Sequence, residues 1–470
     1  MKFKSESWWT RSCGGIDVLR QAVPLIISCG SISLMNFTDR MFLMWYDPDS
    51  MTASMQGMML FWSAVSIPIA VTAFVTTFVA QYSGSGNHNR IGAVVWQGVW
   101  LGFVMTPFLF LIEPYLIQLF VLFKHDDNLI QLERMYFDYM LWGGAATISG
   151  EAAASFFRGR GKMQIEMYNN LFCVALNIFL DYCMIFGKCG FPEWGLAGAA
   201  IATMISQWVR FIIYIVIIFI IDFKDKRYKI ISGMKLNFRL IGRILYYGIQ
   251  SGSYTFVDTI TFTLFIMIIG GLGELERNAT TIAFTMNSLT FIPLTGIGIV
   301  VTSMVGNQLG SNQPNLARRA TNTAFVIGCI YTGFFAILFI TVPDLLLLTF
   351  SIFSDEKEFE AIHSLTIILL RFIALYIFFD SCAFIAGSAL RGAGDTTFIL
   401  RVVFIVAPFL PLLCIVGINF FGLGLMWCWS VLTVIVFVYF TSFTLRFRSK
   451  KWESVRVIEK ELQKGIVTIQ

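Results

Sequence analysis

Four acidic side chains stand inside long apolar segments of the sequence: Asp39, Asp181, Asp258 and Asp380. If those segments cross a bilayer, each charge is costly, and by default such a residue marks the pathway of an ion or a substrate. A carboxyl group at that depth can bind a cation, or it can take up and release a proton. The four acids are therefore candidates for cation chemistry.

The first two acids lie at a similar predicted depth. Asp39 stands eight residues before Asp47, and Asp181 stands seven residues before Lys188. At 1.5 Å per residue, these spacings place the two acids about 12 Å and about 10 Å below the outer ends of their helices. We therefore expect Asp39 and Asp181 to lie close together.

Two neutral polar residues join this pair. Asn177 precedes Asp181 by four residues, so the two share a helix face, and Thr203 lies at a compatible depth in the next apolar segment. Two carboxylates, an amide and a hydroxyl form a hard-oxygen set suited to Na⁺ or to proton exchange. The alternative is that these groups form hydrogen bonds that hold the helices together.

The second pair of acids has a competing interpretation. Asp258 lies near the middle of one apolar segment, and Asp380 lies eleven residues before Arg391 in another. Both are candidates to face a cavity and meet a cation or a cationic substrate. Arg371 shares the segment of Asp380 and needs a partner, so a structural ion pair with either acid is equally open.

Two further charged residues are less specific. Glu151 is close to the inner end of a predicted helix, and we interpret it as a gate candidate or an interfacial group. Arg40 follows Asp39 directly, and neighbours on a helix point about 100° apart, so the two need not pair. Arg40 either meets another helix or extends toward the membrane surface.

The composition identifies the elements that must position these residues. Hydrophobic residues make up 57% of the 470, charged residues 13%, and the mean hydropathy is +0.72. A soluble domain carries roughly 25% charged residues. The apolar segments are long enough to cross a bilayer, which takes about 20 residues, and they lack the strict alternation of barrel strands.

The fold class predicted is an all-α polytopic membrane protein with twelve transmembrane helices. Their predicted ranges are 18–45, 56–81, 93–123, 132–157, 164–187, 195–222, 242–270, 279–307, 319–351, 361–390, 397–418 and 422–446.

The distribution of charge between these helices predicts the orientation in the membrane. One set of turns and the C-terminal tail carry basic residues: Arg90, Arg158, Arg160, Lys162, Lys226, Arg227, Arg318, Arg319, Arg391 and Lys450. The alternate loops carry acids: Asp47, Asp49, Asp126, Asp127, Glu274, Glu276, Asp355 and Glu356. The positive-inside rule then places both termini in the cytoplasm of a multi-pass plasma membrane protein, in the bacterial inner membrane.

Internal repeats predict two six-helix lobes. The segment TTFVAQYSGSGN at 76–87 resembles TSMVGNQLGSNQ at 302–313, and two further matches follow in the same order at a similar offset. Six helices per half is an even number, so both halves insert with one orientation, related by a pseudo-twofold axis along the membrane normal. The predicted parts are a lobe at 1–222, a cytoplasmic linker at 223–241, a second lobe at 242–446 and a cytoplasmic tail at 447–470.

Several functional classes are not supported by the sequence. There is no Walker A, GxSxG or HExxH motif, and the nine cysteines and three histidines form no metal-binding spacing. We therefore expect no enzyme, no cofactor beyond a coupling ion, and no metal unless Na⁺ binds at Asp39 and Asp181. The basic tail is expected to form an amphipathic helix that contacts lipid and not nucleic acid.

The chain resembles the multidrug and toxic compound extrusion (MATE) family over nearly its whole length. The resemblance rests on Asp39 and on four segments in order: NIFLDY (177–182), GLAGAAIAT (195–203), TSMVGNQLGSNQPNLARR (302–319) and SALRGAGDT (388–396).

The resemblance implies a V-shaped pair of six-helix lobes that rock to give alternating access, exporting organic cations or amphipathic compounds in exchange for Na⁺ or H⁺. It implies a first-lobe cation site at Asp39, Asn177 and Asp181, with Thr203 nearby. It also implies a second-lobe site at Asp258 and Asp380. The sequence departs from the family where Gly248-Ile249-Gln250 replaces the usual Gly-Leu-Pro, where Asp258 replaces a frequent glutamate, and at Arg371.

Two other functions remain open at this stage. A lipid-linked glycan flippase can share this architecture, but it would need a more cationic cavity to hold pyrophosphate, and Arg371 and Arg40 are the residues that favour it. A receptor that transports nothing would leave the four embedded acids unexplained. The expected partners are the lipid bilayer and small organic cations, with the protein acting as a monomer.

Overall fold

The computed structural model describes residues 7–122, 127–351 and 356–459, and these residues form helices without any strand. The long helices are α1 (Gly15–Tyr46), α2 (Pro48–Ala73), α4 (Ile91–Leu122), α5 (Asp127–Arg158), α6 (Met163–Ile185), α7 (Gly195–Lys224), α9 (Phe238–Gly270), α10 (Glu274–Gly310), α11 (Pro314–Thr341), α13 (Glu356–Ala393) and α16 (Leu425–Arg448). The shorter helices are α3 (Val75–Gly84), α8 (Ile230–Gly233), α12 (Pro343–Ser351), α14 (Thr396–Val406) and α15 (Phe409–Phe421).

Eleven segments among the described residues are long and apolar enough to cross a membrane. The remaining long helix, α5, has 32 residues and carries more charge. Counting α2 with α3 and α14 with α15, these twelve segments confirm the predicted all-α polytopic fold. The acidic residues Asp126 and Asp355, and the tail beyond Glu459, lie outside the described residues.

Proline explains two differences from the predicted helix ranges. The range 319–351 was predicted as one helix, but α11 ends at Thr341 and α12 begins at Pro343. The range 397–418 is likewise divided between α14 and α15, at Pro408. Proline has no amide hydrogen and its ring crowds the preceding turn, so a helix commonly breaks there.

The described residues divide into two compact units. Unit 1 consists of Met1–Ala22, Ser253–Leu309 and Gln313–Arg456; unit 2 consists of Val23–Gly252, Gly310–Asn312 and Val457–Gln470. Each unit therefore contains a piece from the far end of the chain. Helices α1 and α9 begin in one unit and continue in the other.

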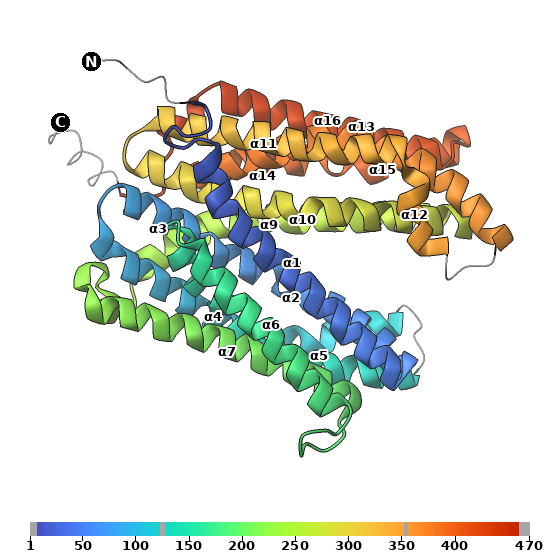
Figure 1. Ribbon diagram of the computed structural model, residues 1–470, viewed down its shortest axis with the longest axis horizontal. Helices are drawn as coiled ribbons and strands as arrows, with labels where there is room; N and C mark the ends of the chain where they lie inside the picture. Colours follow the sequence, from blue (N-terminus) through green and yellow to red (C-terminus); the bar gives the residue numbers. More distant parts are fainter. Residues whose placement is uncertain (1–6, 123–126, 352–355, 460–470) are drawn as a thin grey trace. The chain divides into compact units, whose positions relative to one another are not determined.

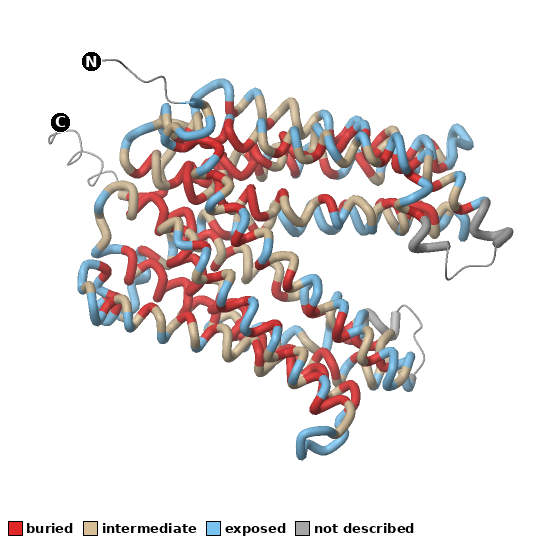
Figure 2. The backbone as a smooth tube through the Cα atoms, viewed as in Figure 1, coloured by how far each residue is buried: buried red, intermediate tan, exposed pale blue. Residues whose placement is uncertain are grey.

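One helix lies at the centre of each unit. In unit 2, α5 packs against α2, α4 and α7; in unit 1, α13 packs against α11 and α16 (Figure 1). The buried residues run along the faces by which these helices meet, as Figure 2 shows. Side chains on α5 and α13 are thus placed where polar groups can meet residues from several neighbours.

The segment that follows α16 differs from the amphipathic helix predicted for it. Residues Lys451–Ser454 form only a short 3₁₀ helix, within which Trp452 is fully buried and stacks on Phe447 at 5.2 Å between ring centroids. Val457 and Ile458 are buried in the hydrophobic core of unit 2. Apolar side chains in the segment explain the difference, because burying them in protein removes the face that lipid would have covered.

Glu459 completes the docking of this segment. Its carboxylate accepts a hydrogen bond from the Tyr82 hydroxyl at 2.8 Å and forms an ion pair with Arg243 at 2.5 Å. The backbone N–H of Val457 donates to Gln81 Oε1 at 2.9 Å. The segment is therefore held by specific polar contacts as well as by apolar burial.

Candidate functional site

A cluster of buried polar side chains in unit 2 brings together four residues predicted from the sequence. Asp39 on α1, Asn177 and Asp181 on α6, and Thr203 on α7 are each less than 5% exposed. In the orientation that satisfies its neighbours, the Asn177 amide nitrogen donates to Asp39 Oδ1 at 3.1 Å and to Asp181 Oδ2 at 3.3 Å. The other end of the amide then meets the Thr203 hydroxyl, at 3.4 Å.

The second oxygen of each carboxyl group in this cluster is not satisfied. Asp39 Oδ2 and Asp181 Oδ1 are buried, and while both groups are ionised neither oxygen accepts a hydrogen bond from the described residues. The two carboxyl groups are close enough to hydrogen-bond to each other once one of them holds a proton. Two negative carboxylates side by side in a buried site repel each other strongly, so one of them must take up a proton or a cation must bind between them. Hydrogen bonds between helices account for Asn177, but they leave these two oxygens unexplained.

The donor set fits a small, hard cation or a proton. Carboxylate, amide and hydroxyl oxygens are the ligands of such ions, whereas transition metals favour histidine and cysteine. No group of three or more histidine, cysteine, aspartate or glutamate residues suited to a metal occurs in the part of the chain that the structure describes.

Helix α5 adds one residue that the sequence analysis missed. Tyr136 is 2% exposed and interacts electrostatically with both Asp39 and Asp181. Glu133, one turn earlier on the same helix, is also fully buried.

Glu151 lies at the other end of α5 in a network of ion pairs. Arg158 contacts Glu151 at 2.6 Å and Glu166 at 2.5 Å, and Arg210 lies 3.8 Å from Glu151. Two carboxylates are thus matched by two guanidinium groups. The sequence analysis placed Glu151 near the inner end of its helix but named neither arginine as its partner. The signal for Arg158 was available, because seven residues along one helix return to nearly the same face.

A small cavity in unit 2 is lined by members of both groups. Its volume is about 120 Å³, and Thr203 from the acidic cluster and Glu151 and Arg210 from the ion-pair network all line it. Most of the remaining lining is apolar, and Asp39, Asn177 and Asp181 are not part of it.

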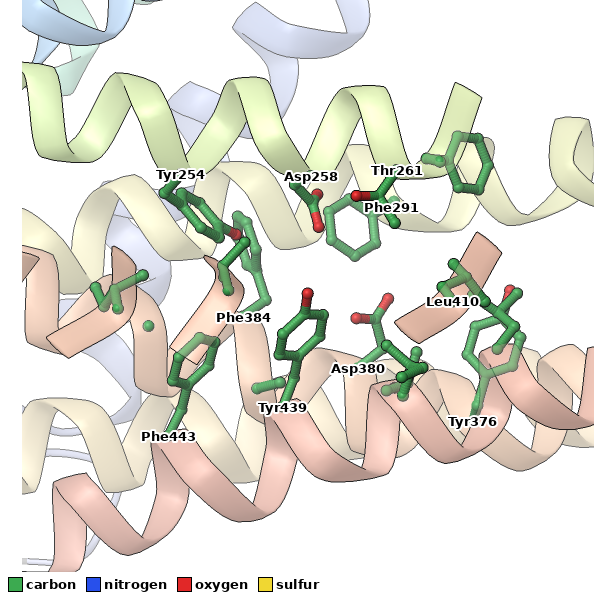
Figure 3. Close-up of a pocket in the computed structure, with 18 of the residues that line it drawn as sticks. Tyr254, Asp258, Thr261, Phe291, Tyr376, Asp380, Phe384, Leu410, Tyr439 and Phe443 are labelled. Atoms are coloured by element: carbon green, nitrogen blue, oxygen red, sulfur yellow. The ribbon is translucent and has the colours of Figure 1, made fainter. Parts of the chain in front are cut away.

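A larger cavity of about 250 Å³ lies in unit 1. Asp258 on α9 and Asp380 on α13 line it and point toward one another, with the Tyr439 hydroxyl beside them (Figure 3). Aromatic rings form much of the wall: Tyr254, Phe262, Phe284, Phe291, Tyr376, Phe384, Tyr439 and Phe443. A flat cation is attracted to both features, because carboxylates and ring faces each favour positive charge.

The guanidinium group in this cavity belongs to Arg391. Arg371 has an exposed side chain and is not among the lining residues, whereas Arg391 lines the cavity. Helix rotation explains this placement, because residues are about 100° apart around the axis. Arg371 is nine residues from Asp380, which places it about 180° away, whereas the eleven residues to Arg391 bring it back within about 20°.

Arg40 is also exposed, although it follows the buried Asp39 directly. Its positive charge interacts electrostatically with the carboxyl group of the adjacent Asp39. The structure thus brings together Asp39, Asn177, Asp181 and Thr203 in unit 2, and Asp258 with Asp380 in unit 1. It leaves Arg371 and Arg40 at the surface of their helices.

Comparison with known proteins gives consistent similarities over the length of the chain. The family model described as MatE matches residues 24–183 and 255–416. The chain is 26% identical over 454 residues to the "Probable multidrug resistance protein NorM" of Thermotoga maritima, and the alignment covers 96% of each chain.

Solved structures share the fold at lower identity. The "Crystal structure of MATE in the bent conformation" matches with a TM-score of 0.82 at 18% identity, covering 99% of this chain and all of that one. A transporter of the MOP superfamily from Pyrococcus furiosus, whose description reports a binding pocket of reversed polarity, matches with a TM-score of 0.80 at 18% identity. That match covers 97% of this chain and all of the other.

Proposed function

The chain belongs to the MatE family of membrane transporters, and on that premise we propose that it is a multidrug efflux transporter. It exports organic cations or amphipathic compounds in exchange for Na⁺ or H⁺, by rocking alternating access. The observation that carries the exchange is the pair of adjacent buried carboxyl groups of Asp39 and Asp181, each of which has an oxygen that accepts no hydrogen bond from the described residues while both are ionised. The relative named as a multidrug resistance protein supports the choice of substrate.

The cluster acts as the ion site of the exchange. A cation or proton that reaches Asp39 and Asp181 neutralises one negative charge. The Asn177 amide donates hydrogen bonds to both carboxyl groups and so holds them in position to bind it. Binding can drive the cycle only if the ion has different affinities for the two conformations of the transporter.

Helix α1 is suited to transmit this difference. It begins in unit 1 and continues in unit 2, and it carries Asp39. Pro24 lies two residues beyond the point at which the helix passes between units, and it removes a backbone hydrogen bond there. A change of charge at Asp39 therefore acts on a helix that is shared by both units and weakened near their boundary.

The cavity of unit 1 holds the exported compound. Asp258 and Asp380 attract its positive charge, and the aromatic wall holds its flat part. The flippase alternative would need a cationic cavity for pyrophosphate, and two acids against one guanidinium disfavour it. The proposed setting is a monomer in the bacterial inner membrane with both termini in the cytoplasm.

The test is transport of ethidium by everted membrane vesicles. A Na⁺ gradient and a proton gradient are imposed separately on the wild type, on Asp39→Asn, and on the matched control Asp49→Asn, whose side chain is exposed. We expect one gradient to drive transport in the wild type and in Asp49→Asn, and neither gradient to drive it in Asp39→Asn.

The Asp39→Asn change keeps the size of the side chain, so the variant should accumulate to the normal level. Normal export by Asp39→Asn would overturn the assignment of the ion site. Absence of transport in the folded wild type under both gradients would overturn the proposed exchange itself.

A further inference from the structure

Helices α1 and α6 of unit 2 are joined by polar contacts at two levels. At one level, Asn170 of α6 donates from Nδ2 to Ser28 Oγ of α1 at 2.5 Å, and both residues are less than 5% exposed. At the other level, Asn177 bridges Asp39 of α1 and Asp181 of α6. The first contact involves no residue of the proposed ion site.

The two levels have the same spacing on both helices. Ser28 precedes Asp39 by eleven residues, and Asn170 precedes Asp181 by eleven residues. Eleven residues make about three turns, so each helix presents both of its residues on one face, roughly 16 Å apart along the axis. A shift of α1 along α6 by one turn, about 5.4 Å, would therefore break both contacts at once.

The polar contacts matter because other packing between these helices is sparse. Among the described helices of unit 2, α6 packs extensively against α7, and α1 packs against none to a comparable extent. An aromatic contact is present at the outer end, where the ring centroids of Phe42 on α1 and Phe186 on α6 lie 5.9 Å apart. A buried hydrogen bond is directional, so it favours one register of the two helices more sharply than apolar contact does.

The Asn170 amide is oriented by a third helix. The hydroxyl of Tyr214 on α7, a residue that is 1% exposed, lies 3.5 Å from Asn170 Oδ1, which leaves the amide nitrogen facing Ser28. Tyr214 in turn interacts electrostatically with Glu166 and Arg210 of the ion-pair network. Asn170 therefore connects α1 to the part of unit 2 in which α6 and α7 pack together.

We propose that Asn170 is a positioning residue of the ion site. Its hydrogen bond to Ser28 fixes the register of α1 on α6, and this register keeps the Asp39 carboxyl group beside that of Asp181. Asn170 is three turns away from these carboxyl groups, so it acts on them only through the position of α1. The inference rests on the proposed function, which it deepens by adding a residue that sets the affinity for the coupling ion.

The neighbouring residue on α6 supplies a matched control. Asn169 is 4% exposed, as Asn170 is, but its amide nitrogen donates to the backbone carbonyl of Arg210 on α7 at 3.0 Å. Asn169→Ala and Asn170→Ala therefore remove the same buried side chain but release different helices. Ser28→Ala removes the bond of Asn170 from the α1 side with a smaller loss of volume, and Ser28→Thr keeps the hydroxyl group.

The first measurement is the dependence of ethidium transport on the coupling ion, in vesicles with the gradient that drives the wild type. The maximal rate and the ion concentration for half-maximal transport are determined separately. We expect Asn170→Ala and Ser28→Ala to need roughly fivefold more ion, the effect of one net hydrogen bond. The double variant should need no more than either single one, because both remove the same bond. Asn169→Ala and Ser28→Thr should match the wild type in this concentration.

The second measurement tests the register of the helices without transport. Phe42→Cys and Phe186→Cys are introduced together, because these side chains face each other in the register described. The background carries Cys183→Ser and Cys189→Ser, which removes the nearby native thiols. Peptide mass mapping of the purified full-length protein then follows the disulfide between the two introduced thiols under a mild oxidant.

We expect this disulfide to form several-fold more slowly with Asn170→Ala or Ser28→Ala, and at an unchanged rate with Asn169→Ala. Folded Asn170→Ala and Ser28→Ala proteins that change only the maximal rate, with the normal disulfide rate, would overturn the proposal. Equal effects of Asn169→Ala would also overturn it, since they would indicate a general loss of stability. Ser28→Ala tests the same bond if Asn170→Ala fails to fold. Absence of gradient-driven transport in the wild type would refute the exporter, and the disulfide rates would still decide the role of Asn170 in the register.

Discussion

Arg158 offers a quantitative test of the buried network in unit 2. Its side chain is 12% exposed, and the two carboxylates that it contacts, Glu151 and Glu166, are 16% and 3% exposed. Changing Arg158 to methionine keeps an extended side chain but leaves both acids with only Arg210, which is 3.8 Å from Glu151. Removing one partner of a buried ion pair costs about 3–5 kcal/mol, because a buried charge is left uncompensated.

This cost is large enough to measure by thermal unfolding in detergent. For a unit of roughly 150–250 residues, 1 kcal/mol shifts the Tm by about 2–4 °C, so we expect a loss of roughly 6–20 °C. The matched control is Arg134→Met. Arg134 also lies near two acids, Glu113 at 3.7 Å and Asp138 at 3.8 Å, but it is 59% exposed. An exposed pair of this kind contributes about 0–1 kcal/mol.

A second substitution separates the loss of charge balance from the loss of packing. In Arg158→Met with Glu166→Gln, one acid and Arg210 remain as a balanced pair, so much of the lost Tm should return. Equal Tm losses for Arg158→Met and Arg134→Met would refute the reasoning that burial sets the cost. So would a double variant as unstable as Arg158→Met alone.

Two further predictions concern segments outside the membrane-spanning helices. Asp47 caps α2, and hydrogen bonds from the Ser50 hydroxyl and backbone N–H, each 2.8 Å long, lower its pKa. Asp47→Ala should therefore cost about 1 kcal/mol at neutral pH. This contribution is present above about pH 3.9 and is lost as the pH falls through the lower folded value, so the Tm of wild type and variant should converge in acid. A Tm difference that stays the same from neutral pH into the acid range would contradict it. Glu459→Gln should break the ion pair with Arg243, and trypsin should then cut after Arg456 roughly tenfold faster or more; an unchanged cleavage rate would show that apolar burial alone holds the segment.

Much of the acidic cluster could be predicted because its determinants are local. The depth of Asp39 and of Asp181 follows from counting residues to the helix end, and the shared face of Asn177 and Asp181 follows from the helical period. These quantities do not depend on how helices pack. The role of the cluster in coupling stays a prediction until transport is measured.

The partners of buried charges could not be predicted in the same way. The pairing of Glu151 with Arg210 on α7, and of Arg158 with Glu166 on α6, depends on which helices pack against α5, and sequence spacing does not determine this. Arg391 and Arg158 are different cases. Rotation around the helix axis places Arg391 on the face of Asp380 in α13 and Arg158 on the face of Glu151 in α5, and this arithmetic was available from the sequence. The predicted lobe boundaries at 222 and 242 also stay predictions.

The docked C-terminal segment has a consequence for how the protein is made. Val457 and Ile458 pack in the core of unit 2, yet the ribosome adds them after segments 23–252 and 310–312 of the same unit. While the helices of unit 2 insert into the membrane, its core therefore lacks these two side chains, and the ion pair between Arg243 and Glu459 has not yet formed. The segment Gln313–Arg456, which belongs to unit 1, is synthesised before Val457 and Ile458. Unit 2 therefore cannot mature before this part of unit 1 has been made, so we expect the two units to mature together.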